Sequence, residues 1–355
     1  MKTIALVFGG KSPEHEISVR SAKNILAAVD RNLFQVLPIG IDPNGVWRLT
    51  DTDTLGAFVP DNGPALALVP GVNHNKIIRL DNQTPLQDPD AVLLILHGPQ
   101  GEDGTVQGLL RIMDLPFIGP DVLGSAVCMD KDFAKRLLKE AGLSVAKGYV
   151  FGDHQKDALD YETLVAELGS PIFIKPANMG SSVGVHKVKD AADFEQAIAD
   201  AFQYDRKIII EEMIYGREVE CAVLGNEAPQ ASVIGEVITA EEYSFDAKYV
   251  SATAAQTRIP AALQSGQMEA LQQTAIKAYQ ALGCEVLSRV DMFLTDQGNI
   301  YVNEINTLPG FTSISMYPQL WEHDGLAYSD LITRLLELAM ARHQKRGALK
   351  TQRIG

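Results

Sequence analysis

The segment Lys175-Pro176-Ala177-Asn178-Met179-Gly180-Ser181-Ser182-Val183-Gly184 lies between two short apolar runs, Ile172–Lys175 and Val185–Val188. Both runs have the composition of β-strands, so the segment between them is predicted to be the loop of a hairpin. Small residues let backbone N–H groups approach phosphate oxygens closely, and the preceding Lys175 supplies positive charge. The loop therefore indicates a phosphate site. A flexible hairpin tip that binds no ligand is the alternative for a glycine-serine loop taken alone.

Around this hairpin the sequence predicts a unit of mixed helices and strands that starts near Cys128. Apolar residues at helical spacing mark two helices, and a run with an almost wholly apolar middle marks a strand. These are the stripe Phe133, Leu137 and Ala141 ending at Gly142, the stripe Phe194, Ile198 and Phe202, and the strand Lys207–Glu211. Lys131, Glu211 and Glu218 are candidates for binding adenine, ribose or triphosphate, although most such side chains are simply solvated.

The first third of the chain alternates strand and helix signals. Ile4–Phe8 is an apolar run that stops at glycine, residues 19 to 29 follow helical spacing, and Gln35–Ile41 and Ala91–Leu96 are further strand-like runs. This order favours a parallel sheet, whose functional loops lie at the carboxyl ends of its strands. No Gly-x-Gly-x-x-Gly follows the first strand, which disfavours a dinucleotide-dependent oxidoreductase. Ala5 also stands where a Walker A loop ending at Gly10-Lys11-Ser12 would need its first glycine.

Near the C-terminus, Ser288–Leu294 and Ile300–Ile305 are predicted strands of a hairpin. Glu304 and Asn306 are two residues apart and therefore share one strand face, and the turn can bring Asp291 beside them. Two carboxylates and an amide oxygen form a hard, all-oxygen group that suits magnesium. An exposed polar strand face is the alternative, which the apolar residues around the group make less favourable.

Two further residues are candidates because of where they stand. Arg289 adjoins the predicted metal group, where a guanidinium could stabilise negative charge on a reacting carbonyl oxygen. A surface salt bridge is the alternative for a single arginine. His97 follows the apolar run Ala91–Leu96 and therefore lies at a strand end, where a structural histidine is the alternative to a functional one.

The composition bounds the class of protein. With 355 residues, the chain is long enough for two or three domains, and its hydrophobic and charged fractions, 46% and 21%, are those of a soluble globular protein. No apolar run is long enough to span a membrane, and the N-terminus lacks the pattern of a signal peptide, so we expect a cytoplasmic protein. A net charge of -14 argues against nucleic-acid binding. The three cysteines, at positions 128, 221 and 284, form no metal or disulfide motif.

The segment from Thr239 to Arg258 has no clear helical or strand period. It carries charges and aromatic residues, including Tyr243, Phe245 and Tyr249. A long irregular loop in a compact enzyme is often a lid over the active site. We therefore predict that this segment is a mobile lid; a static surface loop is the alternative.

Several motifs together resemble the D-alanine–D-alanine ligases, a family of the ATP-grasp superfamily. They occur in the family's order and cover nearly the whole chain, so the ordered set is highly specific. The matching pieces are Phe8-Gly9-Gly10-Lys11-Ser12 with Glu14-His15-Glu16, His97-Gly98 with Gly101-Glu102-Asp103-Gly104, Met129-Asp130-Lys131, Lys175-Pro176 with Gly180-Ser181-Ser182-Val183-Gly184, Gly216-Arg217-Glu218, Lys248-Tyr249, Arg289-Val290-Asp291, and Asn303-Glu304-Ile305-Asn306-Thr307-Leu308-Pro309-Gly310-Phe311-Thr312.

The resemblance implies an α/β and α+β architecture, an ATP-grasp fold with an N-terminal parallel-sheet domain. We expect a substrate domain at 1–127, a central ATP-grasp subdomain at 128–221, and a C-terminal ATP-grasp subdomain with the metal site and lid at 222–355. The resemblance implies that ATP contacts Lys131, Lys175, Ser182, Glu211, Glu218 and Lys248. It implies that Asp291, Glu304 and Asn306 hold two Mg²⁺ or Mn²⁺ ions.

The resemblance also assigns the substrate groups. Glu14 would anchor the ammonium of the first D-alanine, with Ser181 and Tyr249 as its hydrogen-bonding partners. Arg289 and the backbone N–H of Gly310 would form the oxyanion site. The second substrate would lie near His97, Ser315 and Met316. The family also suggests a homodimer.

The implied reaction joins two D-alanines through an acyl phosphate, for peptidoglycan precursor synthesis. A D-alanine–D-lactate ligase would share nearly every motif, and Lys248-Tyr249 resembles the dipeptide-forming branch. A non-catalytic, nucleotide-gated binding module is the other alternative. Such a module would be expected to have lost Arg289 or a metal ligand, and neither is missing from the sequence.

Overall fold

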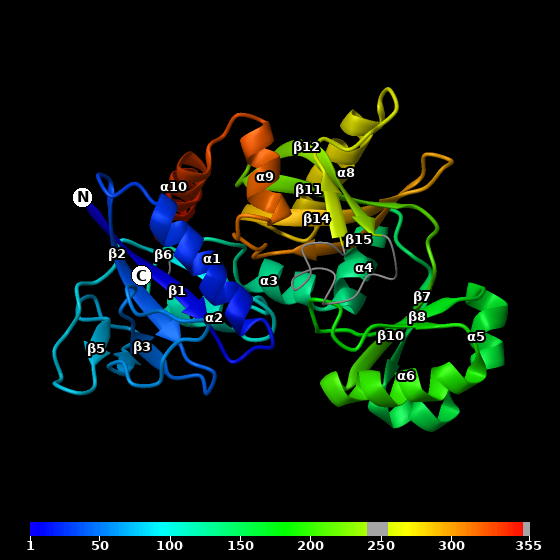
Figure 1. Ribbon diagram of the computed structural model, residues 1–355, viewed down its shortest axis with the longest axis horizontal. Coiled ribbons are helices and arrows are strands. Elements are labelled where there is room, and N and C mark those ends of the chain that lie inside the picture. The colour runs from blue at the N-terminus through cyan, green and yellow to red at the C-terminus, as the bar shows by residue number, and fades with distance from the viewer. Residues whose placement is uncertain (240–254, 351–355) are drawn as a thin grey trace.

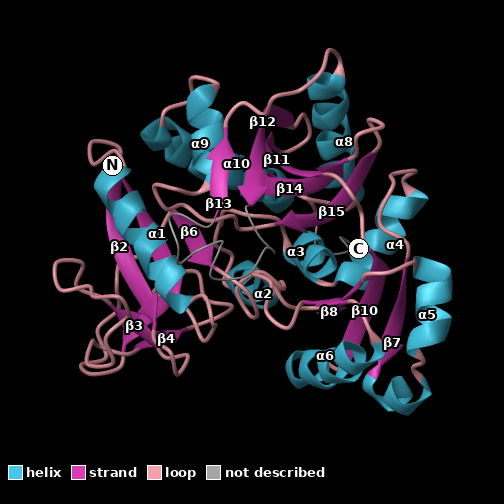
Figure 2. Ribbon diagram, turned by 45° about the vertical axis from the view of Figure 1, so that its right-hand side comes forward, coloured by secondary structure: helices cyan, strands magenta, loops and turns pink. Residues whose placement is uncertain are grey.

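Three β-sheets carry the fold of the computed structural model, which describes residues 1–239 and 255–350 (Figure 1). The N-terminal sheet lies on one side of the molecule, and the other two sheets lie one above the other on the opposite side (Figures 1 and 2). No helix of the described ranges is long and apolar enough to cross a membrane.

The first sheet has the order β3-β2-β1-β6, and β1 is parallel to both of its neighbours. Its central strands are buried along nearly their whole length, because α1 covers one face and α10 reaches β6. This confirms the expected parallel sheet. The elements are β1 (Lys2–Gly9), α1 (His15–Ala28), β2 (Phe34–Ile41), β3 (Trp47–Leu49), β6 (Ala91–Leu96) and α2 (Thr105–Ile112), with a separate hairpin of β4 (Leu66–Leu68) and β5 (Ile77–Arg79).

The second sheet is antiparallel, in the order β7-β10-β8-β9. Its apolar face packs on α5 and α6 (Figure 2). The glycine-serine segment connects β8 to β9, as predicted. The elements are β7 (Gly148–Gly152), a 3-10 turn (Asp153–Ala158), α5 (Tyr161–Leu168), β8 (Ile172–Pro176), β9 (His186–Val188), α6 (Ala191–Tyr204) and β10 (Lys207–Glu212).

The third sheet is also antiparallel, in the order β13-β12-β11-β14-β15. Helices α3, α4 and α8 pack on it and share its core. The elements are α3 (Val122–Met129), α4 (Lys131–Glu140), β11 (Arg217–Gly225), β12 (Gln230–Thr239), β13 (Ala255–Arg258), α8 (Gln267–Ala281), β14 (Val286–Leu294), β15 (Ile300–Asn306), α9 (Met316–His323) and α10 (Tyr328–Gly347).

One local expectation was wrong at its edge. The segment predicted to be irregular ends in β13, which pairs with β12 in the third sheet; residues 240–254 lie outside the described residues. Strand β11 crosses position 221, and we therefore propose that the central subdomain ends before Arg217.

The stripe expected on α4 is also not its buried face. The helix is present, but Phe133 and Leu137 are exposed, whereas Ala134 and Leu138 are buried. The helix turns Lys131 and Lys135 inward, toward the charged partners described below.

Buried polar contacts join the N-terminal sheet to the C-terminal part of the chain. Arg342 of α10 donates to the backbone oxygens of Phe117 and Gly119, at 2.7 and 2.6 Å. At the end of β6, the ring of His97 hydrogen-bonds through Nδ1 to the backbone oxygen of Leu308, at 3.0 Å. Burial is the main cause that lowers the pKa of His97 to about 4. This histidine is therefore neutral in the folded protein at pH 7.

This pKa predicts a specific loss of stability in acid. His97 takes up a proton near pH 6.5 when unfolded but only near pH 4 when folded, so the unfolded state binds more protons between these values. Its contribution is complete above pH 6.5 and is lost as the pH falls through 4. We expect His97→Gln, which removes the titrating ring, to lose less unfolding free energy between pH 7 and 4 than the wild type, by about 3 kcal/mol.

Urea denaturation at a series of pH values measures the difference. His154→Gln is the matched control, because the His154 side chain is 79% exposed. Parallel stability profiles for the wild type and His97→Gln would contradict the assignment.

Candidate active site

A cleft lies between the second and third sheets. Its volume, about 640 Å³, falls within the range of small-molecule sites, roughly 300–1,000 Å³. Strands β8 and β10 line one side, and β11, β12 and β15 line the other. The predicted residues Lys131, Lys175, Ser181, Ser182, Glu211, Glu218 and Glu304 all contribute to its wall.

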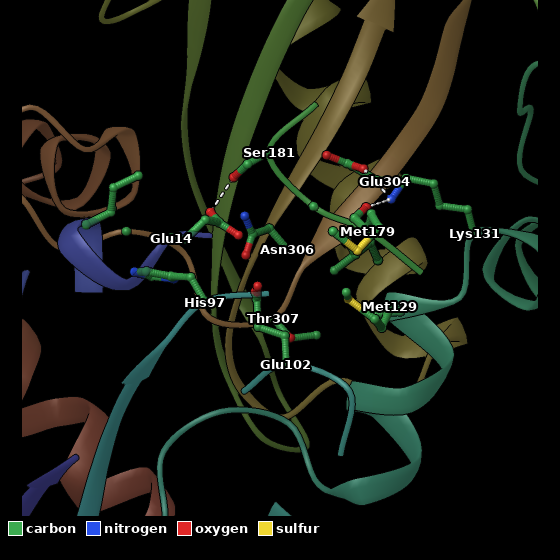
Figure 3. Close-up of a pocket in the computed structure, with 15 residues that line it drawn as sticks. Glu14, His97, Glu102, Met129, Lys131, Met179, Ser181, Glu304, Asn306 and Thr307 are labelled. Carbon is green, nitrogen blue, oxygen red and sulfur yellow. Dashed lines mark hydrogen bonds and ion pairs between the residues drawn. The ribbon is translucent and has the colours of Figure 1, made fainter. Parts of the chain in front are cut away.

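A smaller cavity adjoins this cleft and reaches the carboxyl ends of the first sheet (Figure 3). Glu14, His97, Asn306 and Gly310 line it. Lys131, Ser181 and Glu304, together with Met179 and Gly180, line both spaces. A molecule in the small cavity would therefore lie next to one in the large cleft.

Glu14 and Ser181 meet across the small cavity from distant parts of the sequence. Glu14 precedes α1 and is 7% exposed, and the Ser181 hydroxyl donates to its carboxylate (Figure 3). Ser181 and Ser182 both have positive φ, 50° and 60°, which is uncommon for residues other than glycine. Such backbone conformations concentrate at functional sites because the surrounding structure must hold them.

Lysines surround a buried carboxylate in the wall of the cleft. The two oxygens of Glu211 lie 2.6 Å from Nζ of Lys175 and 2.6 Å from Nζ of Lys135. Burial alone would raise the pKa of Glu211, but the two ammonium groups overcome it and lower that pKa to about 2. Lys135 was missed in the sequence. The only signal was its place one helical turn after Lys131, which puts both lysines on the same side of α4.

Lys131 is the first residue of α4, and it points into both spaces. Asp130 caps the helix by accepting from the backbone N–H groups of Asp132 and Phe133. The Lys131 ammonium donates to the backbone oxygen of Met179 at 2.6 Å and lies 3.4 Å from Glu304 (Figure 3). This lysine thus connects the glycine-serine loop to β15.

The predicted metal group comes together as its hairpin requires. Asp291 of β14 stands opposite Glu304 of β15, and Asn306 stands opposite Arg289. Asp291 is 1% exposed, and both of its oxygens accept from Arg289 at 2.7 Å. The side-chain oxygen of Asn306 is buried and has no hydrogen-bond partner among the described residues.

Arg289 is held more firmly than a surface arginine. Its Nε also lies 2.9 Å from Glu220, a buried carboxylate on β11 that the sequence did not single out. Glu220 is directly opposite Asp291 in the sheet, so two carboxylates share one guanidinium. Arg289 therefore does form salt bridges, but they are buried and not on the surface, as the alternative assumed.

Thr307 and Gly310, in the segment after β15, line the small cavity. A Cβ atom on Gly310 would lie 2.8 Å from the Ser315 hydroxyl, so a side chain there would have to displace that hydroxyl. Ser315 Oγ also accepts from the backbone N–H of Thr312 at 3.0 Å. Met316 is buried against Gly235 and does not line the cavity.

Glu102 belongs to a quoted motif but had no role assigned. Its carboxyl accepts from the backbone N–H groups of Gly98 at 2.6 Å and Leu308 at 3.3 Å. Burial, together with the nearby carboxylate of Glu14, raises its pKa to about 8. Glu102 thereby fixes the loop after β6 to the segment that carries Gly310. Lys248 and Tyr249 lie outside the described residues.

Comparisons with known proteins identify the family of the chain. Residues 3–120 match the family described as D-ala D-ala ligase N-terminus, and residues 137–337 match D-ala D-ala ligase C-terminus. The chain is 50% identical to a D-alanine–D-alanine ligase of Oceanobacillus iheyensis, covering 99% of both chains. It is 48% identical to D-alanine–D-alanine ligase A of Salmonella typhimurium, covering 98% of both.

Solved structures give the same result. The D-alanine-D-alanine ligase from Coxiella burnetii has a TM-score of 0.87 and 37% identity, covering 98% of this chain and 96% of that one. The VanG D-Ala:D-Ser ligase from Enterococcus faecalis has a TM-score of 0.84 and 34% identity, covering 95% of this chain and 99% of that one. The fold is thus the ATP-grasp fold expected from the sequence, and the chain belongs to the D-alanine–D-alanine ligase family.

Proposed function

We propose that this enzyme joins two D-alanines into D-alanyl-D-alanine for peptidoglycan synthesis, through an acyl phosphate made from ATP. Enzymes of this family are ATP-dependent ligases, which implies the use of ATP and a divalent metal ion. The observation that carries the proposal is the pair of adjoining spaces. One is lined by lysines and has the size of a nucleotide site, and the other contains the buried carboxylate Glu14.

The larger space is the proposed ATP site. Lys131, Lys175 and Ser182 line it and supply donors for phosphate oxygens, and Glu218 is an acceptor for adenine or ribose. Glu211 is proposed to contact ATP on the phosphate side, beside Lys175. Lys248 is proposed to act near the terminal phosphate.

The residues at the β14–β15 hairpin fit a divalent metal ion. The observation is the side-chain oxygen of Asn306, which is buried without a hydrogen-bond partner among the described residues and adjoins two carboxylates. We propose that Asp291, Glu304 and Asn306 would hold two Mg²⁺ or Mn²⁺ ions. A bound divalent ion would neutralise phosphate charge during transfer. The Asp291 carboxylate, now on Arg289, would then be shared with the ion.

The first D-alanine is proposed to bind in the smaller space. Its ammonium would pair with Glu14, whose carboxylate Ser181 orients by hydrogen bonding. Tyr249 is proposed as the third member of this group. The carboxylate of D-alanine would then face the shared wall with the ATP cleft, where Lys131 and Glu304 lie.

In the first step, a carboxylate oxygen of D-alanine attacks the terminal phosphorus of ATP, and ADP leaves. The protein's task here is to position two anions and neutralise their charge, because phosphoryl transfer needs no covalent help. In the second step, the neutral amine of the second D-alanine attacks the acyl carbon. The tetrahedral oxyanion forms beside Arg289 and the backbone N–H of Gly310. Phosphate then leaves with the former carboxylate oxygen, and the attacking nitrogen gives up one proton, so that an amide results.

The second D-alanine is proposed to lie near His97, Ser315 and Met316. His97 and Gly310 line the small cavity, and Ser315 lies next to Gly310. The Met316 side chain is buried elsewhere, so Met316 would contribute through its backbone. We further propose that the enzyme works in the cytoplasm, where ATP is made, and as a homodimer.

The direct test is a product assay with ATP, magnesium and D-alanine, run beside L-alanine and D-lactate as acceptors. We expect D-alanyl-D-alanine, ADP and phosphate in equal amounts. A depsipeptide as the main product with mixed D-alanine and D-lactate would instead favour the D-lactate branch. AMP and pyrophosphate as coupled products would contradict the acyl-phosphate route.

Arg289→Ala should reduce turnover by about a hundredfold or more, as removal of an oxyanion donor does. ADP binding should be less affected than turnover, because Arg289 does not line the ATP cleft. Arg334→Ala is the control, since that arginine is exposed on α10. A well-folded Arg289→Ala enzyme with wild-type turnover would remove Arg289 from the oxyanion site.

A further inference from the structure

Lys135 lies behind the wall of the ATP cleft. It is one helical turn after Lys131 on α4, but Lys131 lines the cleft and Lys135 does not. The Lys135 side chain is 9% exposed, and its ammonium lies 2.6 Å from Oε1 of Glu211. The Lys135 ammonium therefore reaches the nucleotide site only through Glu211.

The other oxygen of Glu211 contacts a lysine that does face the cleft. Nζ of Lys175 lies 2.6 Å from Oε2 of Glu211, and both residues line the cleft. A phosphate group entering the cleft can approach Lys175, and it would compete with Glu211 for that ammonium. It cannot compete for Lys135 in the same way.

This difference between the two lysines is important because Glu211 is buried. Its side chain is 3% exposed, and a desolvated carboxylate must keep a cationic partner. With Lys175 as the only partner, Glu211 would hold that lysine away from the phosphate. With Lys135 behind it, the Glu211 carboxylate still has a cationic partner when Lys175 binds the ligand. Two lysines and one glutamate also leave one net positive charge beside the cleft.

We propose that Lys135 is a positioning residue that holds Glu211 from behind and so frees Lys175 to bind nucleotide phosphate. The inference rests on the proposed function, because it takes the cleft to be the ATP site. Lys135 itself touches no substrate. Its loss should therefore weaken the binding of phosphate-bearing nucleotides and leave the binding of the nucleoside nearly unchanged.

The experiment measures dissociation constants of ADP and adenosine by calorimetry with the full-length protein. For Lys135→Met we expect the dissociation constant of ADP to rise about tenfold or more, because one charge-assisted hydrogen bond to phosphate is lost. The dissociation constant of adenosine should change less than about twofold. The ratio of the two constants is the readout. If Lys135 had a purely structural role, its loss would weaken the binding of both ligands equally. An unchanged ratio of the two dissociation constants would therefore overturn the proposal.

Lys207→Met is the matched control. Lys207 lies on β10, as Glu211 does, and its ammonium contacts Asp130 and Asp132 at the start of α4, at 2.5 and 3.3 Å. This variant also removes a lysine–carboxylate contact between β10 and α4, but it leaves Glu211 with both partners. We expect its ADP-to-adenosine ratio to equal that of the wild type.

A second comparison serves in case Lys135→Met does not fold, because the double variant Glu211→Gln, Lys135→Met removes both charges of that pair together. In a Glu211→Gln background, Lys175 is already free of the carboxylate. Adding Lys135→Met should then leave the ADP-to-adenosine ratio within about twofold. A further tenfold loss would mean that Lys135 acts on the phosphate itself, which would overturn the proposal. Failure of the wild type to bind ADP would instead count against the proposed function.

Discussion

Two anions must meet in this enzyme before any bond can form, and that electrostatic constraint explains most of the site. The chain as a whole has a net charge of -14, so it would repel a nucleotide triphosphate and a carboxylate at long range. The positive charge is instead concentrated where it is needed. Lys131, Lys135, Lys175 and Arg289 all have side chains that are at most 13% exposed. In a water-poor setting such charges act more strongly than they would on the surface.

Buried cations in turn need buried anions to hold them in the folded protein. Glu211 lies between two lysines, and Arg289 lies between Asp291 and Glu220. The first arrangement leaves one net positive charge beside the cleft, and the second fixes the Arg289 guanidinium between two carboxylates. The contact of Ser181 with Glu14 plays a comparable part for the substrate, because it ties the glycine-serine loop of the second sheet to the start of α1. The start of α1, the glycine-serine loop of the second sheet and the strands of the third sheet thus depend on one another at the shared wall of the two cavities.

The sequence was most informative where chemistry and local geometry coincide. The hairpin β14–β15 follows from its strand pattern and turn, and its register brings Asp291 opposite Glu304 as predicted. The parallel sheet follows from its buried apolar runs. The order of the motifs identified the family, and through it the candidate residues of both cavities.

What the sequence did not reveal depends on contacts between distant segments. Lys135 and Glu220 look like ordinary surface residues until their partners on other elements are known. The exposure of Phe133 and Leu137 has the same cause, because the helix turns its charged side inward to reach buried carboxylates. Short strands such as β13 have too few residues for a period to be visible, and they form because a neighbouring strand offers an edge.

The central claim is that the carboxylate of one D-alanine is phosphorylated before the peptide bond forms. The most direct measurement follows the oxygen atoms, using D-alanine labelled with ¹⁸O in its carboxylate. If an acyl phosphate forms, the attacking oxygen stays with phosphorus, and the released phosphate carries one ¹⁸O from the substrate. Phosphate free of the label, formed at the same rate as D-alanyl-D-alanine, would contradict the account.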